Sequence, residues 1–255
     1  MKKIIIYLTV FILVISARSE VRTWKDNQGK TYEAELVAEL FDKATLRDVK
    51  GVEFRIPIED LSENDQKYLR VMVPPEMKIE FSMKTEAVPL PKALLPDKGS
   101  AISKVIYPSV TVQKLSRRLF TSSLNLELFL VGKGPERRDF ILVSKSDYNF
   151  LFQVDSDSVN KFTPDPVTVS LFTDDSQDRR GEEYLGHLIV ISDARGNIIK
   201  TQTDIDAWIE SPAVIEELRK LALRGAATVR SRYFDKTGRK VDPPRTQFYK
   251  ARLNN

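Results

Sequence analysis

Few residues of this chain could do covalent or metal chemistry. It has one histidine, His187, and no cysteine, whereas zinc needs several His or Cys ligands and a nucleophilic triad needs a base beside its nucleophile. The sequence contains neither a Gly-x-Ser-x-Gly motif nor a glycine-rich phosphate loop. Because His187 lies in an apolar strand pattern, the sequence favours a structural histidine over a general base.

Two acidic stretches could attract a cation. Asp155 to Asn160 is similar to the start of a calcium loop, but Val159 and Pro166 stand where oxygen ligands are required. The second stretch is a solvated acidic loop with Asp174, Asp175, Asp178, Glu182 and Glu183. We therefore predict no metal site and no cofactor. Carboxylates that meet only in the fold leave a glycoside hydrolase as the enzyme alternative to a non-enzymatic protein.

The first 19 residues are typical of a secretory signal. Two lysines precede an apolar run from Ile4 to Ile15, and the small residues Ala17 and Ser19 suit cleavage. We expect a mature chain that begins at Glu20 and an exported protein, periplasmic or extracellular, in the cell envelope. An uncleaved signal, which would be the one membrane attachment, is the alternative, although the run is shorter than the roughly 20 residues that span a bilayer.

Composition argues against nucleic-acid binding. The formal charge is +4, but without its three basic signal residues the chain has 37 basic and 36 acidic residues, so a strongly cationic surface is not predicted. The charge is uneven, because residues 212–255 contain 11 Lys or Arg and 4 Asp or Glu. This segment could contact an acidic envelope polymer through Arg230, Arg232, Lys236, Arg239 and Lys240, although a solvated charged face is the more common explanation.

Residues 22–57 predict two β-hairpins. Asp26-Asn-Gln-Gly29 and Asp48-Val-Lys-Gly51 are turn sequences in which Asp opens the turn and Gly takes the position with positive φ. From Val52 to Ile56 apolar and charged residues alternate, as in a half-buried strand. Pro57 lacks an N–H and ends this strand.

A short helix follows the hairpins, and here the sequence resembles a known family. Ser62 and Asp65 form a capping box for a helix through Leu69. Residues 22–69 resemble the Sla homology domain 1, a small SH3-like barrel of eukaryotic endocytic adaptors and of some exported bacterial proteins. The matching positions are Arg22, Trp24, Gly29, Ala34, Leu46, Gly51, Ile56, Leu61, Ser62, Asp65 and Tyr68. In the adaptors the resemblance implies binding of Asn-Pro-Phe-x-Asp peptides; for this chain we retain only a peptide- or protein-binding module.

The candidate peptide-binding residues are Arg22, Trp24, Lys25, Arg47, Phe54 and Arg55. Trp24 is either a ligand platform or a core residue, and a very small barrel favours the core. Arg22 and Lys25 could bind a ligand carboxylate. Pairing with Glu33 and Glu35 across the next strand is the favoured alternative.

The rest of the chain predicts a β-sandwich. Residues 73–108 contain six prolines and predict a connector around one possible strand, Met77 to Met83, between a barrel at residues 20–72 and a second domain at 109–255. In the second domain, the predicted strands are Ser109 to Lys114, Ser123 to Val131, Phe140 to Ser144, Asn149 to Val154, Val167 to Thr173, Gly186 to Ser192 and Asn197 to Thr201. Such a series of short strands is typical of a sandwich.

One amphipathic helix follows the strands. Ser211-Pro212 is a helix start, and Val214, Ile215 and Leu218 begin an apolar face. We expect this helix to pack over an open end of the sandwich rather than to bind a partner. The predicted protein is mainly β, an exported non-enzymatic binding or scaffold protein with a protein partner; an envelope polysaccharide-binding protein is the alternative.

Overall fold

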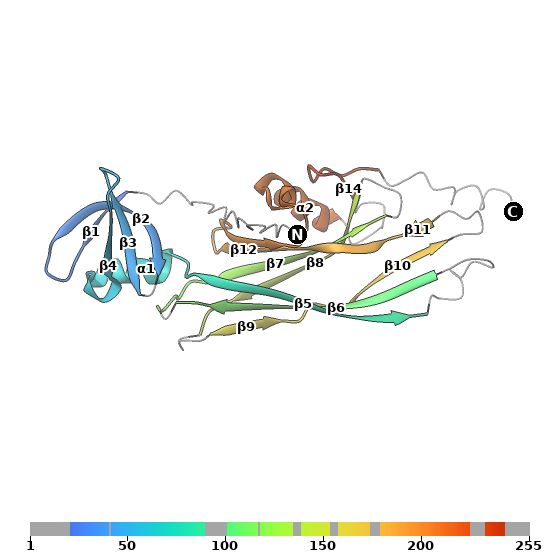
Figure 1. Cartoon of the computed structure of the whole chain (residues 1–255), viewed down its shortest axis with the longest axis horizontal. Coiled ribbons are helices and arrows are strands. Elements are labelled where there is room, and N and C mark those ends of the chain that lie inside the picture. Colours follow the sequence, from blue (N-terminus) through green and yellow to red (C-terminus); the bar gives the residue numbers. More distant parts are fainter. Residues whose placement is uncertain are drawn as a thin grey trace, which may run out of the picture. The chain divides into compact units, whose positions relative to one another are not determined.

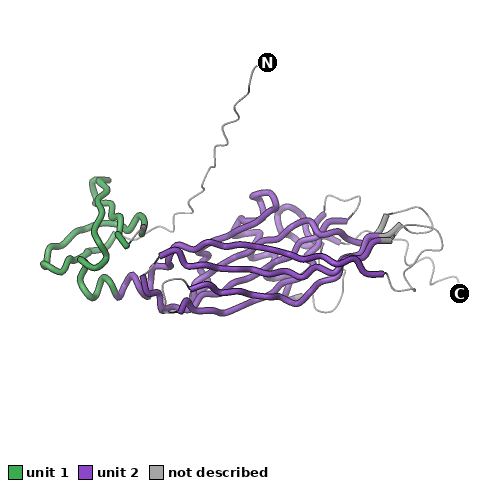
Figure 2. Tube along the Cα trace, turned by 60° about the horizontal axis from the view of Figure 1, so that its bottom comes forward, with its two compact units in different colours: residues 1–66 green, residues 67–255 purple. Residues whose placement is uncertain are grey.

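The chain divides into two compact units, residues 1–66 and 67–255 (Figure 2). The computed structural model describes residues 21–40, 42–89, 101–116, 118–134, 139–153, 158–173, 179–224 and 233–242. The predicted signal peptide lies outside the described residues. In the part of the chain that is described, no helix has the length and apolar character needed to cross a bilayer.

The first unit contains an SH3-like barrel (Figure 1). Its antiparallel strands lie in chain order: β1 (Arg22–Lys25), β2 (Thr31–Leu40), β3 (Lys43–Asp48) and β4 (Glu53–Pro57). A 3-10 helix, η1 (Ile58–Asp60), carries the chain back to β1. There Asn27 N–H donates to the Asp60 carbonyl at 2.8 Å and Ser62 N–H donates to the Lys25 carbonyl at 2.8 Å. These bonds bring the segment after η1 alongside β1 and confirm the predicted barrel.

Helix α1 (Glu63–Met72) begins at the predicted cap. Asp65 N–H donates to Ser62 Oγ at 3.3 Å, and Ser62 Oγ donates to Asp65 Oδ2 at 2.8 Å. The helix runs one turn past the predicted end at Leu69, because its last carbonyls find donors far along the chain. Arg118 donates to the Leu69 and Val73 carbonyls, and Thr121 N–H donates to the Arg70 carbonyl. The boundary between the units therefore falls inside a continuous helix.

Four turns share one Asp-x-x-Gly sequence and one geometry. They begin at Asp26, Asp48, Asp193 and Asp235. In each, the glycine N–H donates to the aspartate carbonyl at 2.9–3.1 Å, and φ of the glycine lies between 78° and 87°. Each aspartate side chain also accepts backbone N–H bonds from two residues of its own turn. These bonds and angles confirm the predicted hairpin turns. A residue with a Cβ would be strained at these glycine positions.

The second unit is a sandwich of two five-stranded antiparallel sheets (Figure 1). In the first sheet β11 (Arg179–Gly181), β10 (Val167–Thr173), β6 (Ala101–Lys114) and β5 (Met77–Val88) follow one another, and β9 (Val159–Phe162) also pairs with β6. The second sheet has the order β13 (Ile198–Thr203), β12 (Glu183–Asp193), β7 (Leu124–Lys133), β8 (Phe140–Phe150) and β14 (Tyr233–Phe234). This architecture confirms the predicted mainly β, sandwich-like fold.

Residues 73–108 differ from the expected connector, because most of the described ones belong to the first sheet. β5 pairs with β6 along its whole length, from Met77 opposite Lys114 to Val88 opposite Ser103. Pro108 lies where β6 has lost its pairing with β10 and has not yet begun that with β9. A strand tolerates proline where one of its sides is unpaired. The prolines of residues 73–108 therefore did not mark a connector as expected.

Both faces of the second sheet are buried. Leu124, Leu126, Leu128 and Leu130 point between the sheets, as their alternation predicts. The alternate residues Phe129 and Val131 pack instead beneath α2 (Pro212–Arg224) with its Ile215 and Leu218. The helix therefore covers the outer face of this sheet, after the short η3 (Ala207–Glu210), and not an open end. The two strands predicted at Phe140 to Ser144 and Asn149 to Val154 are one strand in the structure, β8, which ends at Phe150.

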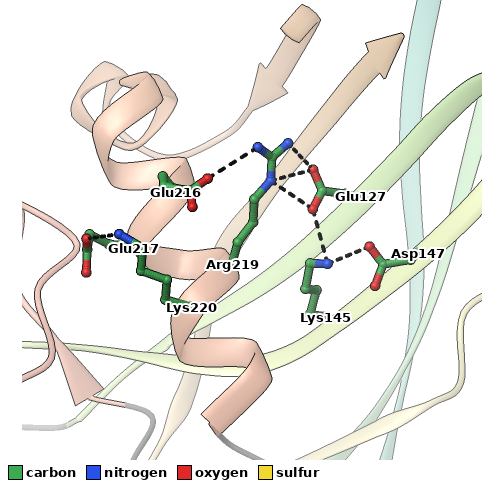
Figure 3. A network of polar contacts seen from close by, with 7 residues as sticks. All are labelled: Glu127, Lys145, Asp147, Glu216, Glu217, Arg219 and Lys220. Atoms are coloured by element: carbon green, nitrogen blue, oxygen red, sulfur yellow. Dashed lines mark hydrogen bonds and ion pairs between the residues drawn. The ribbon is translucent and has the colours of Figure 1, made fainter. Parts of the chain in front are cut away.

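A buried ion network fixes α2 on that face (Figure 3). The Glu127 side chain is only 4% exposed and accepts from Arg219 Nε of α2 at 2.9 Å. Lys145 Nζ lies 3.1 Å from the same carboxylate and also pairs with Asp147. Burial acts to raise the pKa of Glu127, but hydrogen bonds from Arg219 and Lys145 outweigh it, and the pKa lies below its ordinary value.

Candidate binding site on the barrel

Two half-buried aromatic rings meet on the barrel. Tyr32 and Phe54 each lie three residues after the glycine of an Asp-x-x-Gly turn. By strand register Tyr32 is the neighbour of buried Trp24, and Phe54 is the neighbour of buried Leu46. The ring centroids lie 5.4 Å apart. The two hairpins thus place one aromatic ring each at the same rim of the core.

The two turns that precede these rings carry exposed apolar and basic side chains. Val49 and Val52 of the second turn are 67% and 58% exposed. Lys30 Nζ lies 4.9 Å from the centre of the Tyr32 ring, and Tyr32 Oη donates to Asp26 at 2.9 Å. We name Lys30, Tyr32, Val49, Val52 and Phe54 the turn patch. An apolar side chain with an acidic neighbour fits such a surface, because the rings offer area and the ammonium group offers charge.

Two of the predicted binding residues belong to the barrel's own structure. Trp24 is fully buried, and its Nε1 donates to the Ala34 carbonyl at 3.0 Å, as the core alternative expects. The Arg22 guanidinium lies 2.6 Å from Asp65 of α1 and 4.6 Å from the centre of the Trp24 ring. By strand register Arg22 lies opposite buried Ala34, so it is on the core-facing side of the sheet and not on the face of Glu33 and Glu35.

The other predicted residues lie on two faces. Arg47 pairs with Glu35 and Glu53, both at 2.7 Å, in a row across the outer face. Lys25 and Arg55 are exposed on that face by strand alternation. Phe54 points the opposite way, so the six predicted residues do not form one site. Of these six, only Phe54 belongs to the turn patch, and the repeated spacing Asp-x-x-Gly-x-x-aromatic was the missed signal.

The basic C-terminal segment is partly docked on the sandwich. Arg230 and Arg232 lie outside the described residues. Lys236, Arg239 and Lys240 are exposed on the turn after β14, whose Phe234 is fully buried. Lys236 and Lys133 line a groove of about 810 Å³ together with four carboxylates. Those residues are Asp139, Asp204, Asp206 and Asp235. Their charge disfavours an acidic polymer at this place.

His187 lies in the sandwich interior. It is 3% exposed and stacks on Phe81 of the opposite sheet, with ring centroids 3.8 Å apart. Asp204 accepts the His187 backbone N–H at 2.7 Å and lies 3.0 Å from Nδ1. Gly186 makes room for that carboxylate, because a Cβ there would lie 2.5 Å from it. In the described part of the chain, no three His, Asp or Glu side chains are grouped to hold a metal.

The burial of His187 leads us to expect that the stability of the protein depends on pH. Burial lowers its pKa below the ordinary 6.5, although Asp204 acts in the opposite direction. The folded state therefore prefers the neutral ring, and stability is lost as the pH falls below about 6.5 toward the folded pKa. We expect urea unfolding at pH 7.5 and 5.5 to show a smaller difference for His187→Phe than for the parent protein. Equal differences would contradict this prediction.

These features define a small SH3-like barrel followed by an antiparallel β-sandwich. Residues 16–75 match the family model described as SLA1 homology domain 1, SHD1. This match confirms the resemblance at the N-terminal end, and it assigns the barrel to a family of binding modules.

The other comparisons add little. No curated protein matches the chain. A crystal structure from Akkermansia muciniphila is 14% identical, with 55% of this chain and 76% of that chain covered and a TM-score of 0.23. An X-ray structure of Northeast Structural Genomics Consortium target SoR45 is 11% identical, with 49% and 84% covered and a TM-score of 0.22.

Proposed function

We propose that this protein is an exported, non-enzymatic binding protein whose barrel captures an extended segment of a partner protein through the turn patch. One observation carries the proposal: a barrel of the SHD1 type presents Tyr32 and Phe54 side by side, with exposed Val49 and Val52 in the turn that leads to Phe54. Contiguous exposed apolar side chains on a small domain are typical of interaction sites. The signal-like N-terminus supports export to the cell envelope, where the partner would reside.

The edge of the barrel suits an extended partner. Among the described strands, β4 pairs only with β3. The backbone N–H and C=O groups of its second edge could therefore pair with a bound segment. An added strand gains affinity from main-chain hydrogen bonds and specificity from alternate side chains. Phe54 and Arg55 would then contact alternate side chains of the bound segment.

The test uses two exposed residues whose substitution leaves the core intact. Val49→Asp/Val52→Asp should reduce recovery of a specific envelope protein in a crosslinked pull-down by roughly tenfold, because two charges enter an apolar contact. Val37→Asp is the matched control, since Val37 is 38% exposed at the β2 bulge, outside the turn patch. Equal recovery of the same partner by all three proteins would refute the turn patch as the binding site.

A further inference from the structure

Among the described strands of the sandwich, the longest edge strand is regular. β5 has 12 residues, and all of them pair with β6 without a bulge. It is the last strand of its sheet, and no described strand pairs with its other edge. Long, flat edge strands invite pairing with another chain, and proteins interrupt them with proline, bulges or short length, or protect them with charged side chains, especially lysine. The described β5 has none of these interruptions between Met77 and Val88.

The free backbone groups of this edge can be assigned. Lys114, which lies opposite Met77, donates its backbone N–H to Ser158 and not to β5. The Met77 carbonyl accepts from Lys200 Nζ, away from β6. This pair is therefore not hydrogen-bonded, and pairing alternates along an antiparallel ladder. It follows that the N–H and C=O groups of Ile79, Phe81, Met83 and Thr85 point out from the edge.

The side chains of β5 are complementary to a reversed copy of themselves. The exposed face carries, at every second position, Lys78, Glu80, Ser82, Lys84 and Glu86. Reversal about Ser82 brings each lysine opposite a glutamate. In the single chain these charges pair with their neighbours along the strand, Lys78 with Glu80 at 2.6 Å and Lys84 with Glu86 at 2.9 Å, and Glu86 also accepts from Tyr107 Oη of β6 at 3.2 Å. All four side chains are at least 45% exposed.

We propose that β5 pairs antiparallel with β5 of a second copy of this chain, with the two-fold axis at Ser82. Lys78 then faces Glu86 of the second copy, and Glu80 faces its Lys84. These are the pairs without backbone bonds, in which side chains approach most closely. Phe81 and Met83, whose backbone groups point outward, form the hydrogen-bonded pair, and Met83 loses its 46% exposure. The first sheet of one copy and the first sheet of the other then form one continuous sheet. Both copies use the same surface, so the contact is isologous.

The experiment measures the mass of the purified protein by sedimentation equilibrium. The parent protein should be a dimer, and Lys78→Glu or Glu86→Lys alone should weaken association roughly tenfold or more, because two attractive contacts per dimer become repulsive. An equimolar mixture of the two variants should recover the dimer, since every contact in the mixed pair is again between opposite charges. Lys104→Glu on β6 is the charge-matched control and should remain dimeric.

A backbone variant tests the pairing itself. Met83→Pro removes an N–H that points away from β6, so the monomer should fold while the dimer is lost. Circular dichroism checks the fold of each variant. A monomeric parent protein, a dimer that survives both Lys78→Glu and Met83→Pro, or a mixture of charge variants that stays monomeric would each overturn the proposal.

Discussion

Replacing Trp24 with alanine is expected to unfold the barrel, at a cost of about 3–5 kcal/mol. Trp24 is fully buried and is the largest side chain of the barrel core, and its indole N–H is bonded to Ala34. A unit of this size has little other apolar area to compensate. Hydrogen exchange followed by mass spectrometry should show rapid exchange in β1 to β4 and unchanged protection in the sandwich strands.

The control for this variant is Val52→Ala. Val52 is 58% exposed, so its truncation should change stability by less than about 0.5 kcal/mol. Barrel amides that stay protected in Trp24→Ala would contradict the core role of the indole. Hydrogen exchange of Trp24→Ala also shows how its binding result must be interpreted. If the barrel is unfolded in this variant, the loss of a partner reflects unfolding and not the loss of a binding contact.

The second large effect is expected for Arg219→Met in the sandwich. The variant leaves the 4%-exposed Glu127 carboxylate with Lys145 as its remaining cationic partner. Breaking a buried ion pair costs about 3–5 kcal/mol, since the remaining charge is desolvated. Each unit holds one of the two tryptophans, Trp24 and Trp208. Urea unfolding followed by Trp208 fluorescence in a Trp24→Phe background therefore reports on the sandwich.

The double variant Glu127→Leu/Arg219→Met serves as the control. Removal of both charged partners should recover most of the lost stability, because an apolar pair avoids the desolvation cost. The parent protein should also lose stability as the pH falls from the ordinary pKa of a glutamate to the lowered pKa of Glu127, since in that range the unfolded state binds a proton that the folded state does not. Equal stabilities of the single and double variants would show that the loss of stability in Arg219→Met does not come from the broken ion pair.

Local chemistry made part of the fold predictable. The Asp-x-x-Gly turns depend on a glycine φ near 80° and on an aspartate that accepts bonds from its own turn, so four residues suffice to specify them. The Ser62 cap and the Ser211-Pro212 helix start are equally local. The alternating leucines from Leu124 to Leu130 follow from the two-residue period of a strand. The family resemblance combined these local signals over one module.

Residues 77–114 show why longer-range features were missed. Proline indicates a connector wherever the neighbours of a strand are unknown, and only the strand order shows that one side of β6 is unpaired near Pro108. Likewise, an amphipathic helix reveals which of its faces is buried but not what it is buried against. The outer face of the second sheet could receive α2 because Glu127, Phe129 and Val131 point to it.

By itself the sequence determined the kinds of element, their turns and caps, the small barrel and the presence of one histidine and no cysteine. The tertiary structure alone decided that Arg22 binds Asp65 and that Tyr32 and Phe54 meet. The physical reason is separation along the chain. Turns and caps join residues within about one turn of backbone, whereas partners 22 or 43 positions apart are chosen by how strands curve and pack.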